Sequence, residues 1–175
     1  FKHHPMIKKI LEGGKRVSYG ARAITEGGYQ SIPKLAFPGG IILGCSAGLV
    51  NVPRIKGNHN AMISGITAAE VACQAIKEGL RNTELNEYDT AIKSGKIGAD
   101  LKPVKNVKPI WSRFGLLASL IVGGLDMWVA NISGINLFGT LKHGKTDAKS
   151  TKPAKKFNEI QYPKPDGKIS FDRLT

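Results

Sequence analysis

Cysteine is scarce in this sequence, which holds two, Cys45 and Cys73, in 175 residues. A structural zinc or iron–sulfur centre usually takes four closely placed ligands, and a disulfide framework takes several pairs. We therefore expect both cysteines to be small, buried side chains in a reducing compartment, and we expect no metal site. The adjacent His3 and His4 do not change this expectation, because neighbouring side chains point to different faces of a helix or strand.

Acidic and aromatic residues are also few. The 13 Asp and Glu residues stand against 26 Lys and Arg residues, which gives a formal net charge of +13, and aromatic residues make up 7% of the chain. Such an excess of positive charge attracts polyanions, either nucleic acid or an anionic membrane surface. The aromatic residues do not alternate with the basic ones as stacking platforms would, and no RNA- or DNA-reading motif is present. Nucleic acid is therefore not an expected partner.

The most informative stretch runs from residue 37 to residue 69. Ile41, Ile42 and Leu43 form a short apolar run between glycines, which predicts a strand buried on both faces, followed by a tight glycine turn. From Asn60 the pattern predicts a helix that ends near Gly79. Asn58 or Asn60 is placed to cap its first turn, and Gly65 inside it indicates a close approach by another backbone.

A strand, a glycine-rich loop and a helix N-terminus together present backbone N–H groups and a positive dipole end to an electron-rich ligand. An ordinary strand-to-helix connection is the alternative interpretation. The connection from Leu43 to Asn60 is longer than a plain one usually is. Its length favours a ligand-contacting loop.

Short motifs along nearly the whole chain resemble those of one family. In order they are Lys2-His3-His4-Pro5, Leu11-Glu12-Gly13-Gly14-Lys15-Arg16, Tyr19-Gly20-Ala21-Arg22, Glu26-Gly27-Gly28-Tyr29-Gln30-Ser31-Ile32-Pro33-Lys34-Leu35, Phe37-Pro38-Gly39-Gly40, Gly44-Cys45, Asn51-Val52-Pro53, Ile55-Lys56-Gly57, Tyr162-Pro163-Lys164-Pro165-Asp166-Gly167 and Ser170-Phe171-Asp172. The family is that of the electron transfer flavoprotein–ubiquinone oxidoreductases, a branch of the FAD-dependent dehydrogenases and geranylgeranyl-reductase-like enzymes.

The resemblance implies a set of flavin-contacting residues. Two groups would face the flavin, one in the glycine loop and one at the helix start, and a third contact would border it; they are Gly44, Cys45, Ser46 and Gly48, then Gly57, Asn58 and His59, and finally Gln30. Relatives in the wider group often hold a ribityl hydroxyl with an aspartate where this chain has Cys45-Ser46. For Gln30, a loop that only closes a sheet edge is the alternative.

The resemblance also implies the activity. The parent enzyme would pass electrons from reduced electron transfer flavoprotein, through a [4Fe–4S] cluster and FAD, to ubiquinone, and would sit monotopically on the matrix face of the mitochondrial inner membrane, in contact with its lipids. The sequence contains no acid–base pair or nucleophile with catalytic spacing, which suits an enzyme whose cofactor carries the chemistry. It contains neither Gly-x-Gly-x-x-Gly nor four cluster cysteines, so we expect an internal fragment that is inactive alone.

Two alternatives to this function stay open. One is a related FAD-dependent reductase or hydroxylase of a lipid-like substrate, which would share residues 44–69 but would not be expected to share the motif at residues 162–167. The other is a non-enzymatic, membrane-associated fragment of the same fold.

Residues 114–138 contain one charged residue, Asp126, and are long enough to be considered as a membrane span. A charge at mid-membrane and several polar residues in the second half argue against a span. Basic residues and Trp111 and Trp128 near the ends fit a dip into one leaflet. The residues that would form this membrane surface and quinone route are Phe114, Leu116, Leu117, Leu120, Ile121 and Trp128. A core helix of a soluble fold is the alternative.

We predict an α+β fold with part of an FAD-binding domain and part of a quinone-binding, membrane-contacting domain. The expected divisions are 1–82 for the flavin-contacting region, 83–144 for the helical and apolar region, and 145–175 for a connector toward an iron–sulfur domain. Smaller expectations are a helix within 81–102 with Thr83 as its cap, strands at 16–21 and 169–171, and a solvated loop at 145–156.

Overall fold

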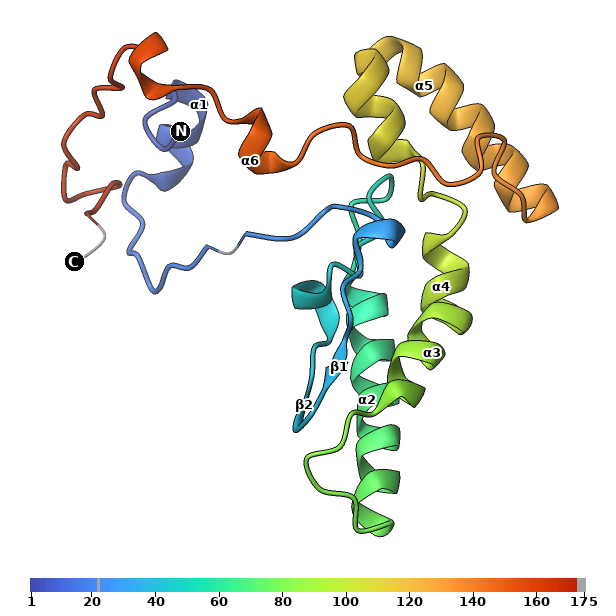
Figure 1. Ribbon diagram of the computed structural model, residues 1–175. Helices are drawn as coiled ribbons and strands as arrows, with labels where there is room; N and C mark the ends of the chain where they lie inside the picture. Colours follow the sequence, from blue (N-terminus) through green and yellow to red (C-terminus); the bar gives the residue numbers. More distant parts are fainter. Residues whose placement is uncertain (22, 173–175) are drawn as a thin grey trace. The chain divides into compact units, whose positions relative to one another are not determined.

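The computed structural model describes residues 1–21 and 23–172, and the chain divides into two compact units (Figure 1). One unit is Ala23–Lys149, and the other combines Phe1–Arg22 with Ser150–Thr175. The larger unit has four long or medium helices and a two-stranded antiparallel sheet. The predicted α+β class is confirmed. The expected domain boundaries stay a prediction.

A short β-hairpin precedes the glycine loop. Strand β1 (Ala36–Phe37) pairs with β2 (Gly40–Ile41), with Ala36 opposite Ile41. Gly39 makes the turn with a φ of 80°, a value that favours glycine. The predicted buried strand over 41–43 is wrong, because only its first residue pairs and Leu43 is 43% exposed. After Ile41 the chain turns into the 3-10 helix η2 (Gly44–Ala47), so these apolar residues pack on a helix and extend no sheet.

Helix α2 (Asn58–Lys77) confirms the predicted helix. Its stop is also confirmed, since Gly79 has a φ of 70° and the Leu80 N–H donates to the Ala75 carbonyl at 2.9 Å. The predicted asparagine cap is wrong, because the N-cap residue is Gly57 and makes no side-chain cap hydrogen bond. Gly65 has no atom within 4 Å of where its Cβ would lie, so the predicted close backbone approach is wrong too.

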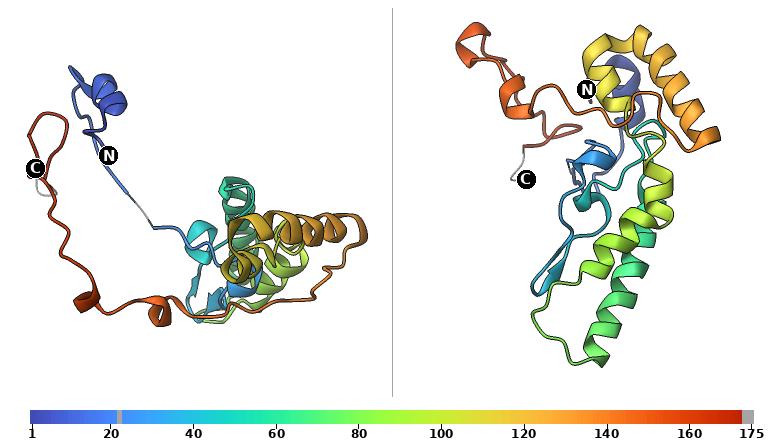
Figure 2. Two further views of the ribbon diagram at one scale, coloured as in Figure 1. Left: turned by 90° about the horizontal axis from the view of Figure 1, so that it is seen from above. Right: turned by 45° about the vertical axis from the view of Figure 1, so that its right-hand side comes forward.

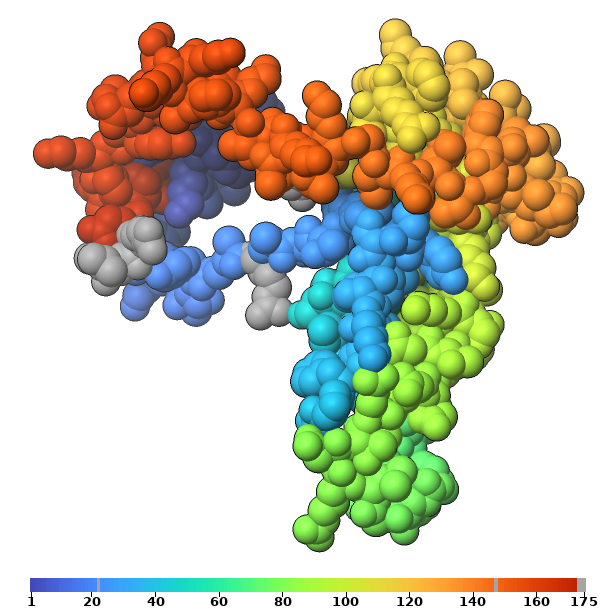
Figure 3. Space-filling view, viewed as in Figure 1, coloured from blue at the N-terminus to red at the C-terminus, as the bar shows by residue number. Residues whose placement is uncertain are grey.

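Two helices occupy the region where one was predicted. Helix α3 (Asn86–Ser94) and helix α4 (Lys96–Leu101) meet at Gly95. Tyr88 and Ile92 are buried as expected, but Thr83 caps nothing, since its hydroxyl donates to the Arg81 carbonyl. With the hairpin and loop, α2 to α4 enclose the core, which consists of Leu35, Ala47, Leu49, Ala68, Tyr88, Ile92, Ile97 and Leu101. Figure 3 shows the blue and cyan hairpin segment lying against the green helices.

Helix α5 (Val107–Ser133) is bent at Gly115, whose φ of 70° and ψ of −172° lie outside the helical region (Figures 1 and 2). It ends at Gly134, which has a φ of 75°. Residues 134–143, here called the return strap, then run back along α5. Their hydrogen bonds with the beginning of α5 are described below.

The smaller unit contains α1 (Pro5–Leu11) and the 3-10 helix η3 (Ala154–Lys156), while α6 (Asp147–Ser150) lies at the unit boundary. Within 1–21 and 150–172 there is no strand, so the predicted strands at 16–21 and 169–171 are wrong. The expected loop at 145–156 contains the two short helices just named. Asp166 forms the turn that the motif predicted, and backbone N–H groups of Ser170 and Lys168 hold the pKa of Asp166 well below its usual range.

Candidate functional site

The glycine loop packs against the first half of α2. The Gly44 N–H donates to the Ser64 hydroxyl at 2.9 Å, and a Cβ at Gly44 would lie 3.4 Å from that of Ala61. A Cβ at Gly48 would lie 3.3 Å from Thr25 Cγ2, with φ at 73°. Positive φ and limited space both favour glycine at these two positions. The loop is therefore held at a fixed distance from the helix.

The start of α2 carries unpaired donors. Its first intrahelical hydrogen bond runs from the Ala61 N–H to the Gly57 carbonyl at 2.8 Å, so the N–H groups of residues 58–60 have no backbone partner among the described residues. Asn58 and His59 are exposed. Free N–H groups and the positive end of the helix dipole together favour an electron-rich group at this point. Six of the predicted contacts, from Gly44 through His59, thus lie on two segments that pack together, and Gly57 backs onto Val50.

The cysteine expectation is wrong in one respect. Cys45 is half-buried in η2 and Cys73 is exposed on α2, so neither is a fully buried core residue. Both follow from helix position, because each falls on a face that α2 and η2 do not cover in this unit. Ser46 beside Cys45 is exposed. Among the described residues no group of three His, Cys, Asp or Glu side chains could hold a metal ion.

Gln30 makes its hydrogen bonds away from the glycine loop. It lies in the 3-10 helix η1 (Tyr29–Ser31), and its Nε2 donates to the carbonyls of Lys105 and Leu141, each at 2.8 Å. Its Oε1 is buried and has no partner among the described residues. The side chain therefore connects the residue before α5 to the end of the return strap. A contact of Gln30 with a flavin stays a prediction.

A polar cluster around Asp100 of α4 fixes the start of α2. Four side chains reach this carboxylate: Asn51 Nδ2 at 3.1 Å, Arg54 Nη1 at 3.1 Å, His59 Nε2 at 3.1 Å and Asn60 Nδ2 at 3.0 Å. Burial acts to raise the pKa of Asp100, but hydrogen bonds from Asn60, Asn51 and His59 outweigh it and hold this pKa below its usual range. The carboxylate is thus the shared acceptor for the loop at 51–54 and the first turn of α2.

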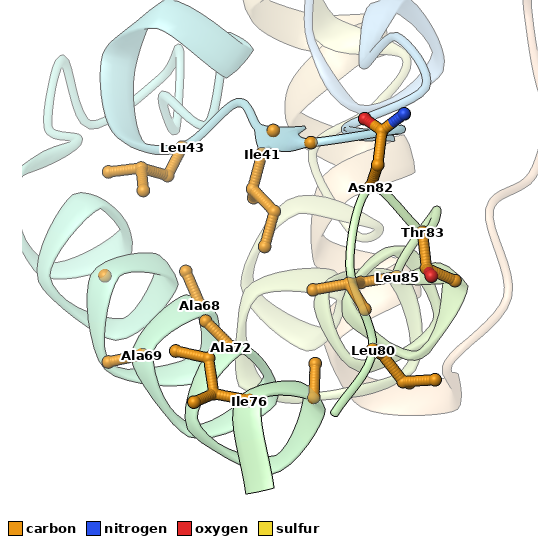
Figure 4. A pocket seen from close by; sticks show the side chains of 14 residues that line it. Ile41, Leu43, Ala68, Ala69, Ala72, Ile76, Leu80, Asn82, Thr83 and Leu85 are labelled. Atoms are coloured by element: carbon orange, nitrogen blue, oxygen red, sulfur yellow. The ribbon is translucent and has the colours of Figure 1, made fainter. Parts of the chain in front are cut away.

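An apolar groove of about 530 Å³ lies between the hairpin and the second half of α2 (Figure 4). Figure 4 shows Ile41, Leu43, Ala68, Ala72 and Leu85 turned toward it. Gly65 borders the groove, which explains why this glycine has open space beside it. None of the predicted flavin-contacting residues lines it.

The apolar face of α5 is exposed in this unit. Helix α5 is, among the described residues, long and apolar enough to cross a membrane by length and composition alone. All six predicted membrane residues are at least half exposed: Phe114, Leu116, Leu117, Leu120, Ile121 and Trp128. The described residues do not cover this face, so within them α5 is not the core helix of the alternative interpretation. The bend at Gly115 shortens the straight part to roughly 27 Å, below the roughly 30 Å of a bilayer core.

Asp126 lies on the opposite face of α5 and is 1% exposed. Its carboxyl oxygens accept hydrogen bonds from Asn106 Nδ2 at 3.1 Å, Asn136 Nδ2 at 2.9 Å and the Phe138 N–H at 3.3 Å. The sequence argument treated this residue as a charge in the middle of the apolar segment. In the structure it is enclosed by polar partners and faces away from the exposed apolar residues.

The return strap brings both ends of the apolar segment to the same place. The Leu141 N–H donates to Asn106 Oδ1 at 2.9 Å, and Arg113 Nη2 donates to the Lys142 carbonyl at 2.9 Å. His143 contacts the Gly27 carbonyl at 2.7 Å. The basic residues before α5 and those after the strap therefore lie near one end of the hairpin.

Sequence reasoning missed the two carboxyl clusters. Asp100 is the only acidic residue between Asp89 and Asp126, within a stretch rich in lysine, and this isolation was a signal that it has a specific partner. The asparagines that bind the two carboxyl groups are far from them in sequence, with separations of 49 and 40 residues for Asn51 and Asn60. No spacing rule connects residues so far apart.

Comparison with known proteins gave consistent results. The chain is 46% identical to the mitochondrial electron transfer flavoprotein-ubiquinone oxidoreductase of Homo sapiens, over 100% of this chain and 29% of the relative. It is 48% identical to the protein of the same name from Arabidopsis thaliana, over 98% of this chain and 26% of the relative, and 46% identical to that of Caenorhabditis elegans, over 100% and 30%. The chain thus spans less than a third of the length of these relatives. No protein family model matches it.

The identity is nearly uniform across animal, plant and nematode relatives, and it extends over the glycine loop, α5 and the motif at residues 162–167 alike. The family recognised from the sequence motifs is therefore confirmed: from its first residue to its last, this chain is similar to one segment of the electron transfer flavoprotein–ubiquinone oxidoreductases.

Proposed function

We propose that this chain is the segment of an electron transfer flavoprotein–ubiquinone oxidoreductase that contacts FAD and the membrane. The complete enzyme would pass electrons from reduced electron transfer flavoprotein to ubiquinone on the matrix face of the mitochondrial inner membrane. The observation that carries the proposal is the identity of 46–48% over essentially the whole chain. The [4Fe–4S] cluster would have its ligands outside the chain described here.

The residues at the start of α2 fit a flavin. FAD, when bound, supplies the two-electron chemistry, and the protein supplies position and electrostatics. The free N–H groups of residues 58–60 favour electron-rich atoms, and the exposed Asn58 side chain can donate or accept a hydrogen bond. Gly44, Cys45, Ser46 and Gly48 offer the backbone of a short loop beside them.

The hairpin of α5 and the return strap fits a dip into one leaflet. Such a dip requires both flanks of the apolar segment to lie on the same side of the membrane. The hydrogen bonds of Asn106 with Leu141 and of Arg113 with Lys142 bring the flanks together. Basic residues there, including Lys105 and Lys145, would engage anionic headgroups, while the exposed apolar face would enter the acyl region.

The same surface fits access for ubiquinone. A long isoprenoid tail dissolves only in the bilayer, so a site that reduces the headgroup has to open toward the membrane. Leu116, Leu117 and Leu120 follow the bend at Gly115 and are 53%, 79% and 63% exposed. We place the quinone route along this side of α5.

Replacing the three leucines with glutamate in the full-length enzyme tests this proposal. Each buried leucine contributes roughly 1.5 to 3 kcal/mol of transfer free energy, so binding to liposomes should weaken by roughly 100-fold or more. Ubiquinone reduction should slow, while reduction of a water-soluble acceptor at the flavin should remain.

The matched control changes the same three leucines to methionine, which keeps them apolar and should preserve membrane binding. Persistent liposome binding of the glutamate variant would refute the membrane surface. Equal loss of both activities together with unfolding would show that α5 is a core helix. A full-length protein that transfers no electrons from reduced electron transfer flavoprotein to ubiquinone would refute the proposed activity itself.

A further inference from the structure

Asp100 controls the orientation of Asn60. A carboxylate accepts hydrogen bonds and donates none, so the Asn60 amide must point its Nδ2 toward it, and the observed distance is 3.0 Å. The Oδ1 of Asn60 therefore points the other way. Asn60 is 1% exposed, and its Oδ1 has no hydrogen-bond partner among the described residues.

A buried amide oxygen without a donor is uncommon in folded proteins, because the lost solvation is costly. This one lies in the first turn of α2, beside the unpaired N–H groups of residues 58–60. The helix start therefore offers several donors and one acceptor to the same neighbourhood. Its acceptor faces a group that carries an N–H or O–H.

Asp100 holds this arrangement from a separate helix. Its two carboxylate oxygens receive donors from Asn51, Arg54, His59 and Asn60, which belong to the loop before α2 and to α2 itself. Arg54 is exposed, whereas Asn51 and Asn60 are 1% exposed. The buried amides, whose geometry is the most restricted, thus depend on one carboxylate.

We propose that Asn60 Oδ1 accepts a hydrogen bond from a hydroxyl or N–H group of the bound FAD, and that Asp100 is the positioning residue that orients it. The inference rests on the proposed flavin-contacting role of this helix start. It adds a fully buried acceptor to the exposed contacts already predicted there, and it assigns Asp100, which contacts no cofactor itself, a role in cofactor affinity.

A double-mutant cycle in the full-length protein tests the inference. Asn60→Ala removes the acceptor, and Asp100→Asn lets the two amides face each other without a fixed orientation. Each change should raise the Kd for FAD, measured by titration of the apoprotein, about fivefold to tenfold. If Asp100 acts through Asn60, the double variant should bind FAD about as weakly as either single variant. The midpoint potential of the flavin should shift in both single variants.

Asp89→Asn is the matched control. Asp89 of α3 is also a partly buried carboxylate, and it accepts hydrogen bonds from the Leu35 and Ala36 N–H groups at 3.1 and 2.9 Å. Its substitution should lower the melting temperature of the apoprotein to a similar degree while leaving the Kd for FAD within about twofold, since it does not touch the start of α2. A comparable loss of FAD affinity in this control would overturn the inference.

The remaining outcomes separate the inference from the proposed function. If the Kd for FAD is unchanged in Asn60→Ala while Asn58→Ala shifts the flavin potential, the flavin contact stands and the buried acceptor belongs to the protein's own packing. Additive effects of Asn60→Ala and Asp100→Asn would overturn the positioning role of Asp100. If the wild-type protein binds no FAD, the proposed function and this inference both fail.

Discussion

The return strap is expected to detach from α5 when Asp126 is replaced by leucine. Leucine has a similar volume but offers no acceptor to Asn106, Asn136 and the Phe138 N–H, all of which now donate to Asp126. Each of these hydrogen bonds contributes about 1 kcal/mol, and a buried donor left unpaired costs about 1 to 3 kcal/mol. The two asparagines keep a second acceptor, the carbonyls of Gly139 and Pro103, so the lower figure applies to them.

The expected total is about 3 kcal/mol, which corresponds to roughly 150-fold in the equilibrium for local opening of the strap. Hydrogen–deuterium exchange of the full-length protein measures this opening. Peptides that cover residues 134–143 should lose protection, and the Phe138 and Leu141 amides should exchange faster by about this factor. Peptides from α2 should be unaffected.

Asn131→Leu is the control, because Asn131 lies on α5 and its amide bonds only to the Met127 carbonyl of the same helix. It makes the same kind of change, polar to leucine, without touching the strap. Unchanged exchange at Phe138 and Leu141 in the Asp126 variant would refute the role of this cluster. A uniform rise across the whole chain would mean that Asp126 supports the fold globally and not the strap.

Two further predictions concern backbone strain and acid stability. Gly115→Ala should lower the melting temperature of the full-length protein, since the φ of 70° and ψ of −172° at this bend cost a non-glycine residue roughly 1 to 3 kcal/mol, and an unchanged melting temperature would mean that the bend is absent. The pKa of Asp100 lies below its usual 3.8, so its stabilising effect is present above about pH 4 and is lost as the pH falls through the lower, folded-state pKa. Urea unfolding of Asp100→Asn should therefore show a weaker acid dependence below pH 4 than the wild type, and an equal dependence would contradict this assignment.

Local sequence signals predicted the elements that local interactions determine. The alanine-rich run after residue 58 and the glycine at 79 defined α2, because helix propensity and a left-handed C-terminal residue act within a few positions. The buried spacing of Tyr88 and Ile92 was also visible. The break at Gly95 was missed, since its reason is spatial: a Cβ at Gly98 of α4 would collide with the Lys93 carbonyl of α3.

Predictions of strands and of the site failed where distant partners decide. The apolar run at 41–43 reads as a strand, yet its position beside α2 turned it into the edge of a groove. The candidate loop and helix start could be located from glycine and asparagine positions. The carboxyl groups that organise them, Asp100 and Asp126, depend on contacts across 20 to 49 residues that no periodicity records.

The two carboxyl clusters also bear on how the proposed flavin contact and membrane surface work together. Asp100 is followed, after a few residues, by Asn106, which binds Asp126, and a cavity of about 380 Å³ is lined both by Asn51 and Asp100 and by Met127 of α5. Gln30 adds a second tie by joining the Lys105 and Leu141 carbonyls. The start of α2 and the base of the α5 hairpin therefore belong to one compact unit. In the proposed enzyme, the distance between flavin and quinone entry would be set by this packing and would need no domain movement, so variants of the exposed leucines should leave FAD affinity intact while Asp100 variants leave liposome binding intact.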